Sequence, residues 1–232
     1  MMRSTLLTHS ARGKVDSPAP RESGAFTARL GEIDMFFQGN DPIHQTMRRV
    51  AARLEQANIP YAIVGGMAVN AHHHERTTRD VDFLLSAEGL TGLRKIAAAG
   101  EFDAVPGHPR RFVDRLTGAS FDILVTGLFP GSGKPGPIAY PDPEHVSQTI
   151  DDLRVVNLPT LIQLKLAAHR YQDFADVVNL IRANKLDESF AENLHATLRG
   201  DYIECLEEKR REDEYEARQD QAIEEERGPD GP

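Results

Sequence analysis

The strongest constraint on the fold is the stretch 61–85, YAIVGGMAVNAHHHERTTRDVDFLL. Its pattern predicts an apolar strand that ends at Gly65-Gly66, a short helix, and a second apolar strand that carries Asp80 and Asp82. Alternate side chains of a strand point to the same face, so these two carboxylates share a face about 7 Å apart. Such a pair suits a divalent cation, although a merely polar strand face would have the same spacing.

The diglycine stands immediately before the predicted short helix. Glycine lets the backbone approach a ligand closely, and the free N–H groups at a helix start attract phosphate. Gly65 and Gly66 alone would equally suit a tight turn without a ligand. Their coupling to Asp80 and Asp82 favours phosphate binding, so the whole stretch indicates metal-dependent transfer chemistry on a nucleotide.

The order of these residues resembles the signature of the DNA polymerase β-type nucleotidyltransferase superfamily: hydrophobic-Gly-Gly, thirteen residues, then Asp-hydrophobic-Asp-hydrophobic. The run RTTRD, which ends at Asp80, is most similar to small prokaryotic members, which include the AbiEii-type toxins of toxin–antitoxin systems and related stand-alone nucleotidyltransferases. The resemblance implies an α/β (α+β) fold, in which helices flank a small mixed β-sheet and a helical part follows. It also implies Mg²⁺-dependent transfer of a nucleoside monophosphate from an NTP to an acceptor hydroxyl.

A third carboxylate, Asp122, lies in the predicted strand SFDILV. An unpaired acid is costly to bury in an apolar strand, so Asp122 faces either an active site or the water at a sheet edge. The resemblance implies that Asp80 and Asp82 bind both metal ions of a two-metal site. It implies that Asp122 binds the catalytic metal and accepts the proton of the attacking hydroxyl. The backbone N–H groups of Gly65 and Gly66 would then contact the β- and γ-phosphates.

The later stretch LPTLIQLKLAAHRYQDFADVVNLI resembles the later motifs of the AbiEii-type family, a lysine on one helix followed by an R-x-(K/R)-D-x-x-D segment. Lys165 adjoins an apolar helix face, where its ammonium needs a partner such as a triphosphate. The alternative is a surface lysine whose ammonium reaches water. Asp173 and Asp176 share a helix face and suit a catalytic role, a helix cap or a salt bridge to Arg170. Gln172 replaces the basic residue that is common in this segment.

The resemblance makes Lys165 a catalytic residue beside the three aspartates. The acceptor it implies is RNA such as tRNA, a protein side chain or a small molecule such as an aminoglycoside, and a cognate antitoxin is a further expected partner. The alternative is a non-catalytic nucleotide-binding or protein-interaction module on the same fold. The nucleotide-binding residues that the resemblance implies are Gly65, Gly66, Arg76, Thr78, Arg79, Lys165, Arg170, Asp173 and Asp176.

Composition limits the class of protein further. The 232 residues are 40% hydrophobic, which suffices for one packed core domain. No apolar run is long enough to span a membrane and no signal-peptide pattern occurs, so we expect a cytoplasmic protein without a membrane partner. The single cysteine, Cys205, excludes internal disulfides and cysteine-rich zinc sites. The net charge of −9 is concentrated in the acidic residues 201–232, so the core neither signals nor excludes a nucleic-acid acceptor.

Four parts are expected along the chain. Residues 1–30 are rich in Ser, Arg, Pro and Gly without periodicity, which predicts disorder, and a mis-assigned start codon would explain them equally. Asp41 and Pro42 suit the N-cap and first position of a helix. The expected parts are a mostly disordered leader (1–40), a nucleotidyltransferase α/β core (41–157), a helical C-terminal part (158–200), and an acidic helix with a disordered tail (201–232).

Periodicity and turn residues predict the remaining elements. The stretch 127–144 is expected to be a loop, and its GSGK run lacks the earlier glycine and the following Ser or Thr of a P-loop. His72, His73 and His74 are poor joint metal ligands because consecutive helical residues point in different directions. Strands are expected at 61–64, 80–85, 102–105, 111–116, 120–125 and 154–156, and helices at 41–58, 87–99 and along most of the chain from 159 to 226.

Overall fold

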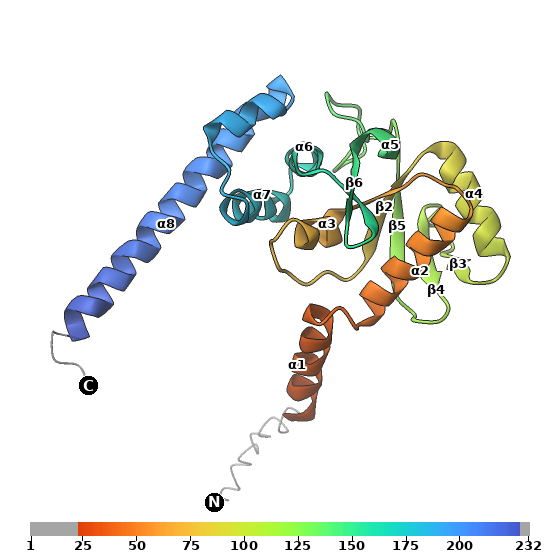
Figure 1. The fold of residues 1–232 in the computed structure, drawn as a ribbon, viewed down its shortest axis with the longest axis horizontal. Coiled ribbons are helices and arrows are strands. Elements are labelled where there is room, and N and C mark those ends of the chain that lie inside the picture. Colours follow the sequence, from red (N-terminus) through yellow and green to blue (C-terminus); the bar gives the residue numbers. More distant parts are fainter. Residues whose placement is uncertain (1–22, 228–232) are drawn as a thin grey trace, which may run out of the picture.

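The computed structural model describes residues 23–227, and Figure 1 shows their course. Residues 1–22 of the expected leader and 228–232 of the expected tail lie outside this range. The centre is a seven-stranded mixed sheet with strand order β3-β4-β5-β2-β1-β7-β6. Its strands are β1 (Ala62–Val64), β2 (Val81–Leu85), β3 (Phe102–Ala104), β4 (Arg111–Asp114), β5 (Ser120–Val125), β6 (Ser147–Ile150) and β7 (Leu153–Val156).

Helices flank this sheet and form the C-terminal part. The prediction of a small mixed sheet flanked by helices, followed by a helical part, is therefore confirmed. The helices are α1 (Ser23–Phe37), α2 (Pro42–Gln56), α3 (Gly65–Ala71), α4 (Ala87–Ala98), α5 (Pro143–Val146), α6 (Leu158–Ala168), α7 (Tyr171–Ala183) and α8 (Arg199–Arg227), with 3-10 turns at Glu188–Asn193 and Ala196–Leu198.

The sheet has one buried apolar face and one face that carries the acids. Strand β2 pairs parallel with β5 and antiparallel with β1, and Phe83 lies opposite Ile123 in the β2–β5 register. Alternation along the strands places these apolar side chains on one face, which α2 and α4 cover. The alternate residues Asp82 and Asp122 therefore share the other face.

Helix α2 begins where the sequence predicts. The Asp41 carboxylate accepts the backbone N–H of Ile43 at 2.7 Å, and Pro42 occupies the first turn, where its missing N–H is no loss. This cap fixes the start of the helix whose apolar stripe, which includes Val50 and Leu54, packs into the core.

One expectation of irregular structure is wrong, and one strand was not predicted. Residues 23–37 of the expected leader form α1, and the Phe36 ring packs edge-on against His44 at a centroid distance of 4.9 Å. Strand β6 is also absent from the prediction. Its hairpin with β7 turns through Asp151 and Asp152, both with positive φ, and this pair lacks the glycine that usually marks such a turn.

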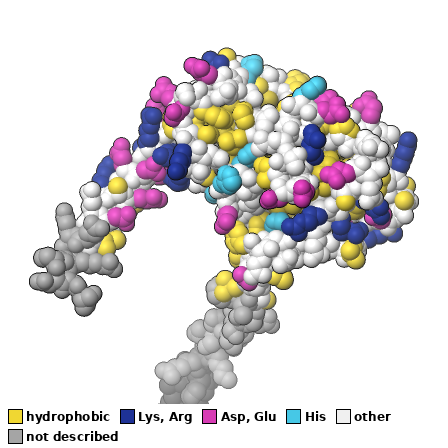
Figure 2. All heavy atoms as spheres, in the orientation of Figure 1, with side chains coloured by type: hydrophobic (Ala, Val, Ile, Leu, Met, Phe, Trp, Pro, Cys, Tyr) yellow, Lys and Arg dark blue, Asp and Glu magenta, His cyan; other side chains and the backbone are white. Residues whose placement is uncertain are grey.

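The C-terminal helices pack on one another at one side of the sheet, and α8 then extends away from the core. The first turns of α8 are anchored by buried Tyr202, Cys205 and Leu206, and the Tyr202 hydroxyl donates to the Asp187 carbonyl at 2.9 Å. Farther along, acidic and basic side chains cover the helix (Figure 2). No helix within residues 23–227 combines the length and apolarity needed to cross a membrane.

An ion pair whose acid is fully buried joins α2 to the sheet. The Asp114 side chain on β4 is 0% exposed and accepts the Arg49 Nε–H at 2.7 Å and the Leu116 N–H at 2.9 Å. A second Arg–Asp pair joins Arg115, the residue after β4, to Asp103 on β3 but leaves both side chains more than half exposed. The two pairs differ mainly in burial.

Burial therefore predicts a difference between two equivalent truncations. Asp114→Ala removes the buried partner of Arg49 and leaves the Leu116 N–H without its acceptor, so it is expected to lower the free energy of unfolding by about 2 kcal/mol. Asp103→Ala removes a solvent-screened pair and is expected to leave the free energy of unfolding almost unchanged. Urea denaturation of both variants measures the difference, and equal losses would contradict this role for Asp114.

Candidate active site

A cleft of about 780 Å³ opens on the acid-bearing face of the sheet. Strands β2 and β5, the start of α3, the junction of α6 with α7, and the loop between β5 and α5 border it. Of the predicted site residues, only Asp176 does not line this cleft, because it is fully buried. The predicted residues that line it are Gly65, Gly66, Arg76, Thr78, Arg79, Asp80, Asp82, Asp122, Lys165, Arg170 and Asp173.

Strand register brings the carboxylates together. Asp82 lies directly opposite Asp122 in the parallel β2–β5 pair, and Asp80 immediately precedes β2. Asp122 lies on an interior strand, between β2 and β4, so the alternative of an acid at a sheet edge is wrong. Residues far apart in the sequence therefore form one acidic row across two strands.

The first glycine is required by its contact with Asp82. Gly65 has a φ of +63°, and a Cβ built there would lie 1.9 Å from Oδ2 of Asp82. Gly66 is crowded as well, because its Cβ would lie 2.8 Å from Oγ1 of Thr78. The diglycine thus brings backbone directly beside a carboxylate, where the opening of α3 faces the cleft.

Burial and the neighbouring acids change the ionisation of Asp82. Burial, followed by the charges of Asp80 and Asp122, raises the pKa of Asp82 to about 7. Lys165 and Arg170 lower it only in part. Binding of a cation would stabilise the ionised form of this carboxylate, because the cation offsets both the desolvation and the repulsion from the neighbouring acids.

An arginine occupies the acidic row. Arg111 on β4 lies opposite Asp122 in the antiparallel register and donates to both oxygens of that carboxylate, at 2.8 and 2.5 Å. Its guanidinium also lies 3.7 Å from Asp80. Arg111 was not predicted as a site residue, because its place in the row depends on the pairing of β4 with β5.

The three acids offer the oxygen ligands that a hard divalent cation prefers. Within the described residues, however, no three His, Cys, Asp or Glu side chains already form a metal-binding group. The bidentate contact of Asp122 with Arg111 supplies a physical reason, since that carboxylate has a cationic partner of its own. The metal site at Asp80, Asp82 and Asp122 thus stays a prediction, and the donor set fits it once Arg111 releases Asp122.

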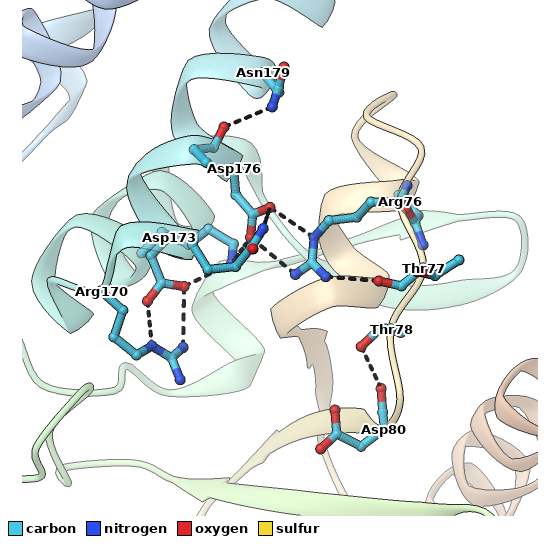
Figure 3. Close-up of polar contacts among 12 residues, drawn as sticks. Arg76, Thr77, Thr78, Asp80, Arg170, Asp173, Asp176 and Asn179 are labelled. Atoms are coloured by element: carbon cyan, nitrogen blue, oxygen red, sulfur yellow. Dashed lines mark hydrogen bonds and ion pairs between the residues drawn. The ribbon is translucent and has the colours of Figure 1, made fainter. Parts of the chain in front are cut away.

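A second charged cluster closes the other wall of the cleft (Figure 3). The Lys165 ammonium is buried and donates to Asp173 at 3.1 Å and to Asp176 at 2.6 Å. Arg76 reaches the same Asp176 carboxylate at 2.8 Å from the loop that follows α3. The alternative of a surface lysine is therefore wrong for Lys165, because aspartates instead of water satisfy its charge.

The segment after Lys165 completes the cluster. Arg170 donates to Asp173 at 2.6 Å, which confirms the salt bridge considered from their spacing. Gln172, at the position where a basic residue is common, donates to Asp176 at 3.2 Å. Lys165, Arg76 and Arg170 thus face two aspartates, and one positive charge remains in excess on this wall.

Other cleft residues were missed from the sequence or have structural roles. Thr78 donates to the Asp80 carbonyl at 3.2 Å and so shapes the entry to β2. Tyr140 and Arg110 line the cleft without having been predicted, and burial raises the pKa of Tyr140 to about 12.

His72 is buried and its Nε2 lies 2.8 Å from the Val156 carbonyl oxygen, a packing role. The GSGK loop, rejected as a P-loop, also borders the cleft.

The contact between Gly65 and Asp82 predicts the effect of adding one methyl group. Gly65→Ala is expected to lower stability by about 1 kcal/mol through its left-handed backbone, and to displace Asp82 in addition. Gly107→Ala is the matched control, because Gly107 also has positive φ but no atom lies within 4 Å of the position that its methyl group would take. Thermal melts and divalent-cation titrations of both variants test this, and equal cation binding would contradict the contact.

No protein-family model matches the chain, and no curated protein matches it in sequence. Solved structures match in part. ANT(2″)-Ia in complex with adenylyl-2″-tobramycin is 14% identical with a TM-score of 0.46, over 69% of this chain and 96% of that chain. JHP933 from Helicobacter pylori is 14% identical with a TM-score of 0.41, over 65% of this chain and 70% of that chain.

The lincosamide antibiotic adenylyltransferase LnuA, lincomycin-bound, is 16% identical with a TM-score of 0.37, over 55% of this chain and 89% of that chain. These identities and TM-scores are low, so the likeness is no argument for an activity. Any function assigned to this chain therefore rests on the residues of its own cleft.

Proposed function

We propose that this protein is a nucleotidyltransferase that uses Mg²⁺ to move a nucleoside monophosphate from an NTP to an acceptor hydroxyl. The observation that carries the proposal is the acidic row beside the diglycine. Asp82 and Asp122 lie opposite each other in register, Asp80 adjoins them, and Gly65 abuts the Asp82 carboxylate. Carboxylates suit a divalent cation and a diglycine backbone suits phosphate, and the lining of one cleft by both supports the proposal.

Each group has a role in a balanced transfer. The acceptor oxygen forms a bond to the α-phosphorus, the bond from that phosphorus to the bridging oxygen breaks, and pyrophosphate leaves. Asp122 accepts the proton of the attacking hydroxyl, and the backbone N–H groups of Gly65 and Gly66 bind the leaving phosphates. Asp80, Asp82 and Asp122 would hold the divalent cations, which would supply neutralisation of the phosphate charge.

The wall of the cleft that carries Lys165, Arg76 and Arg170, here the basic wall, suits the triphosphate. Lys165 has three N–H donors, of which two are directed to Asp173 and Asp176, so one remains for a ligand in the cleft. Arg79 is exposed at the cleft, and no ion pair or hydrogen bond of its guanidinium occurs among the described residues. Positioning and charge neutralisation by such groups account for most catalysis in phosphoryl-group transfer.

One observation favours a second candidate, a non-catalytic nucleotide-binding or protein-interaction module. Arg111 already neutralises Asp122 and would have to release it for a two-metal site to form. The side chain of Arg111 is 41% exposed, so this ion pair is open to exchange with a cation from solvent.

The resemblance to AbiEii-type toxins extends the proposal to a toxin with a cognate antitoxin, which growth arrest on expression would test.

Transfer of label separates the two candidates. We expect α-³²P from an NTP to enter an acceptor in an RNA-plus-lysate mixture with Mg²⁺, and Asp82→Asn to reduce transfer by about 100-fold or more. Asp103→Asn, an exposed acid outside the cleft, is the control that should retain it. Stabilisation of the protein by Mg²⁺-NTP without any transfer would instead support the binding module.

Cation binding should depend on pH through Asp82. Its raised pKa means that the folded protein holds a proton there up to about pH 7, and a cation must displace this proton. Affinity for Mn²⁺ is expected to rise about tenfold per pH unit from about pH 5 and to level off above pH 7. Calorimetry on the wild type and Asp82→Asn measures this, and an affinity independent of pH in the wild type would contradict it.

A further inference from the structure

A second hollow continues the cleft beyond Asp122. Its volume is about 320 Å³. It shares four residues with the active-site cleft, namely Arg110, Arg111, Asp122 and Leu124, and it extends from them to His108 and Pro109 in the turn before β4. The two hollows therefore adjoin each other along these four residues, of which Asp122 is one.

The sheet order determines the position of this hollow relative to the diglycine. Neighbouring strands run β4-β5-β2-β1, so side chains on the acid-bearing face follow the lateral order Arg111, Asp122, Asp82 and then Gly65 at the end of β1. In the transferase function proposed above, a triphosphate bound at Gly65 would occupy one end of this row. The hollow at Arg110 and His108 lies at the opposite end, on the side from which a second substrate can reach Asp122.

Charge shows what kind of molecule this hollow suits. Its charged or chargeable side chains are His108, Arg110, Arg111 and Asp122, and Asp122 is already paired with Arg111. Arg110 is exposed, and its guanidinium has no ion pair or hydrogen bond within residues 23–227. A polycationic acceptor would find no free carboxylate here, whereas phosphate oxygens would find a free guanidinium.

We propose that this hollow is the acceptor subsite, and that Arg110 binds a phosphate group of a phosphate-bearing acceptor whose hydroxyl approaches Asp122. The proposal rests on the transferase function proposed above. A polynucleotide strand and a small phosphate ester share this chemistry. The position of Arg110 beside Asp122 places the bound phosphate next to the reacting hydroxyl in either case.

Binding of two phosphate-bearing probes tests the proposal. The probes are a fluorescein-labelled single-stranded RNA 12-mer and AMP, each titrated into the full chain with Mg²⁺ and α,β-methylene NTPs. Tobramycin serves as the cationic probe. The variants are Arg110→Glu and Arg110→Ala, and Arg210→Glu on α8 is the matched control because Arg210 is also exposed but lies outside both hollows.

We expect Arg110→Ala to weaken binding of the RNA or of AMP about tenfold, Arg110→Glu to weaken it further, and Arg210→Glu to leave it within about twofold. A loss with RNA alone identifies a strand as the acceptor, and a loss with AMP identifies a phosphate ester. Equal effects of the Arg110 and Arg210 variants, no binding of either probe, or tobramycin binding that Arg110→Glu leaves unchanged would overturn the proposal.

A separate readout distinguishes failure of this proposal from failure of the proposed function. Stabilisation of the wild type by Mg²⁺-NTP reports the nucleotide site itself, at the Gly65 end of the row. If that stabilisation is present and the Arg110 variants bind the probes normally, only the acceptor subsite is wrong. If it is absent, the transferase function fails with it.

Discussion

The parallel pairing of β2 with β5 is the constraint on which the site depends. It places Asp82 opposite Asp122, and the antiparallel pairing of β4 with β5 adds Arg111 to the same row. A shift of one residue in the β2–β5 register would move Asp82 to the apolar face, where Phe83 and Ile123 pack under α2 and α4. The same alternation of side chains therefore directs apolar residues to the core and acids to the cleft, and core packing stabilises the register.

Two kinds of charge pairing divide the cleft. Lys165, Asp173 and Asp176 are buried, so their pairing is part of the folded structure and would be costly to break. Arg111 and Asp122 are partly exposed, and such a pair is worth little in water, so a stronger cation can replace it. The basic wall thus keeps its buried ion pairs, whereas a metal cation can replace Arg111 as the partner of Asp122 in the acidic row. This difference suits a cleft that binds and releases charged ligands.

Local patterns predicted most elements and the residues that gather in the cleft. The strand-glycine-helix-strand pattern around Gly65 and Asp82 rests on short-range physics, so it could be predicted. Arg111 could not, because its role depends on which strands pair. Lys165 was recognised as needing a partner, but only the packing of α6 on α7 shows that Asp173 and Asp176 supply it. Strand β6 was not predicted because its Asp-Asp turn contains no glycine.

The central claim is that the acidic row binds cations beside a triphosphate held at the diglycine. Anomalous diffraction from crystals grown with Mn²⁺ and a non-hydrolysable NTP tests it most directly. The account predicts manganese bound to Asp80 and Asp82, Arg111 separated from Asp122, and phosphate oxygens within hydrogen-bonding distance of the Gly65 and Gly66 N–H groups. Manganese elsewhere, or a triphosphate bound away from Gly65 with the Arg111–Asp122 pair intact, would contradict it.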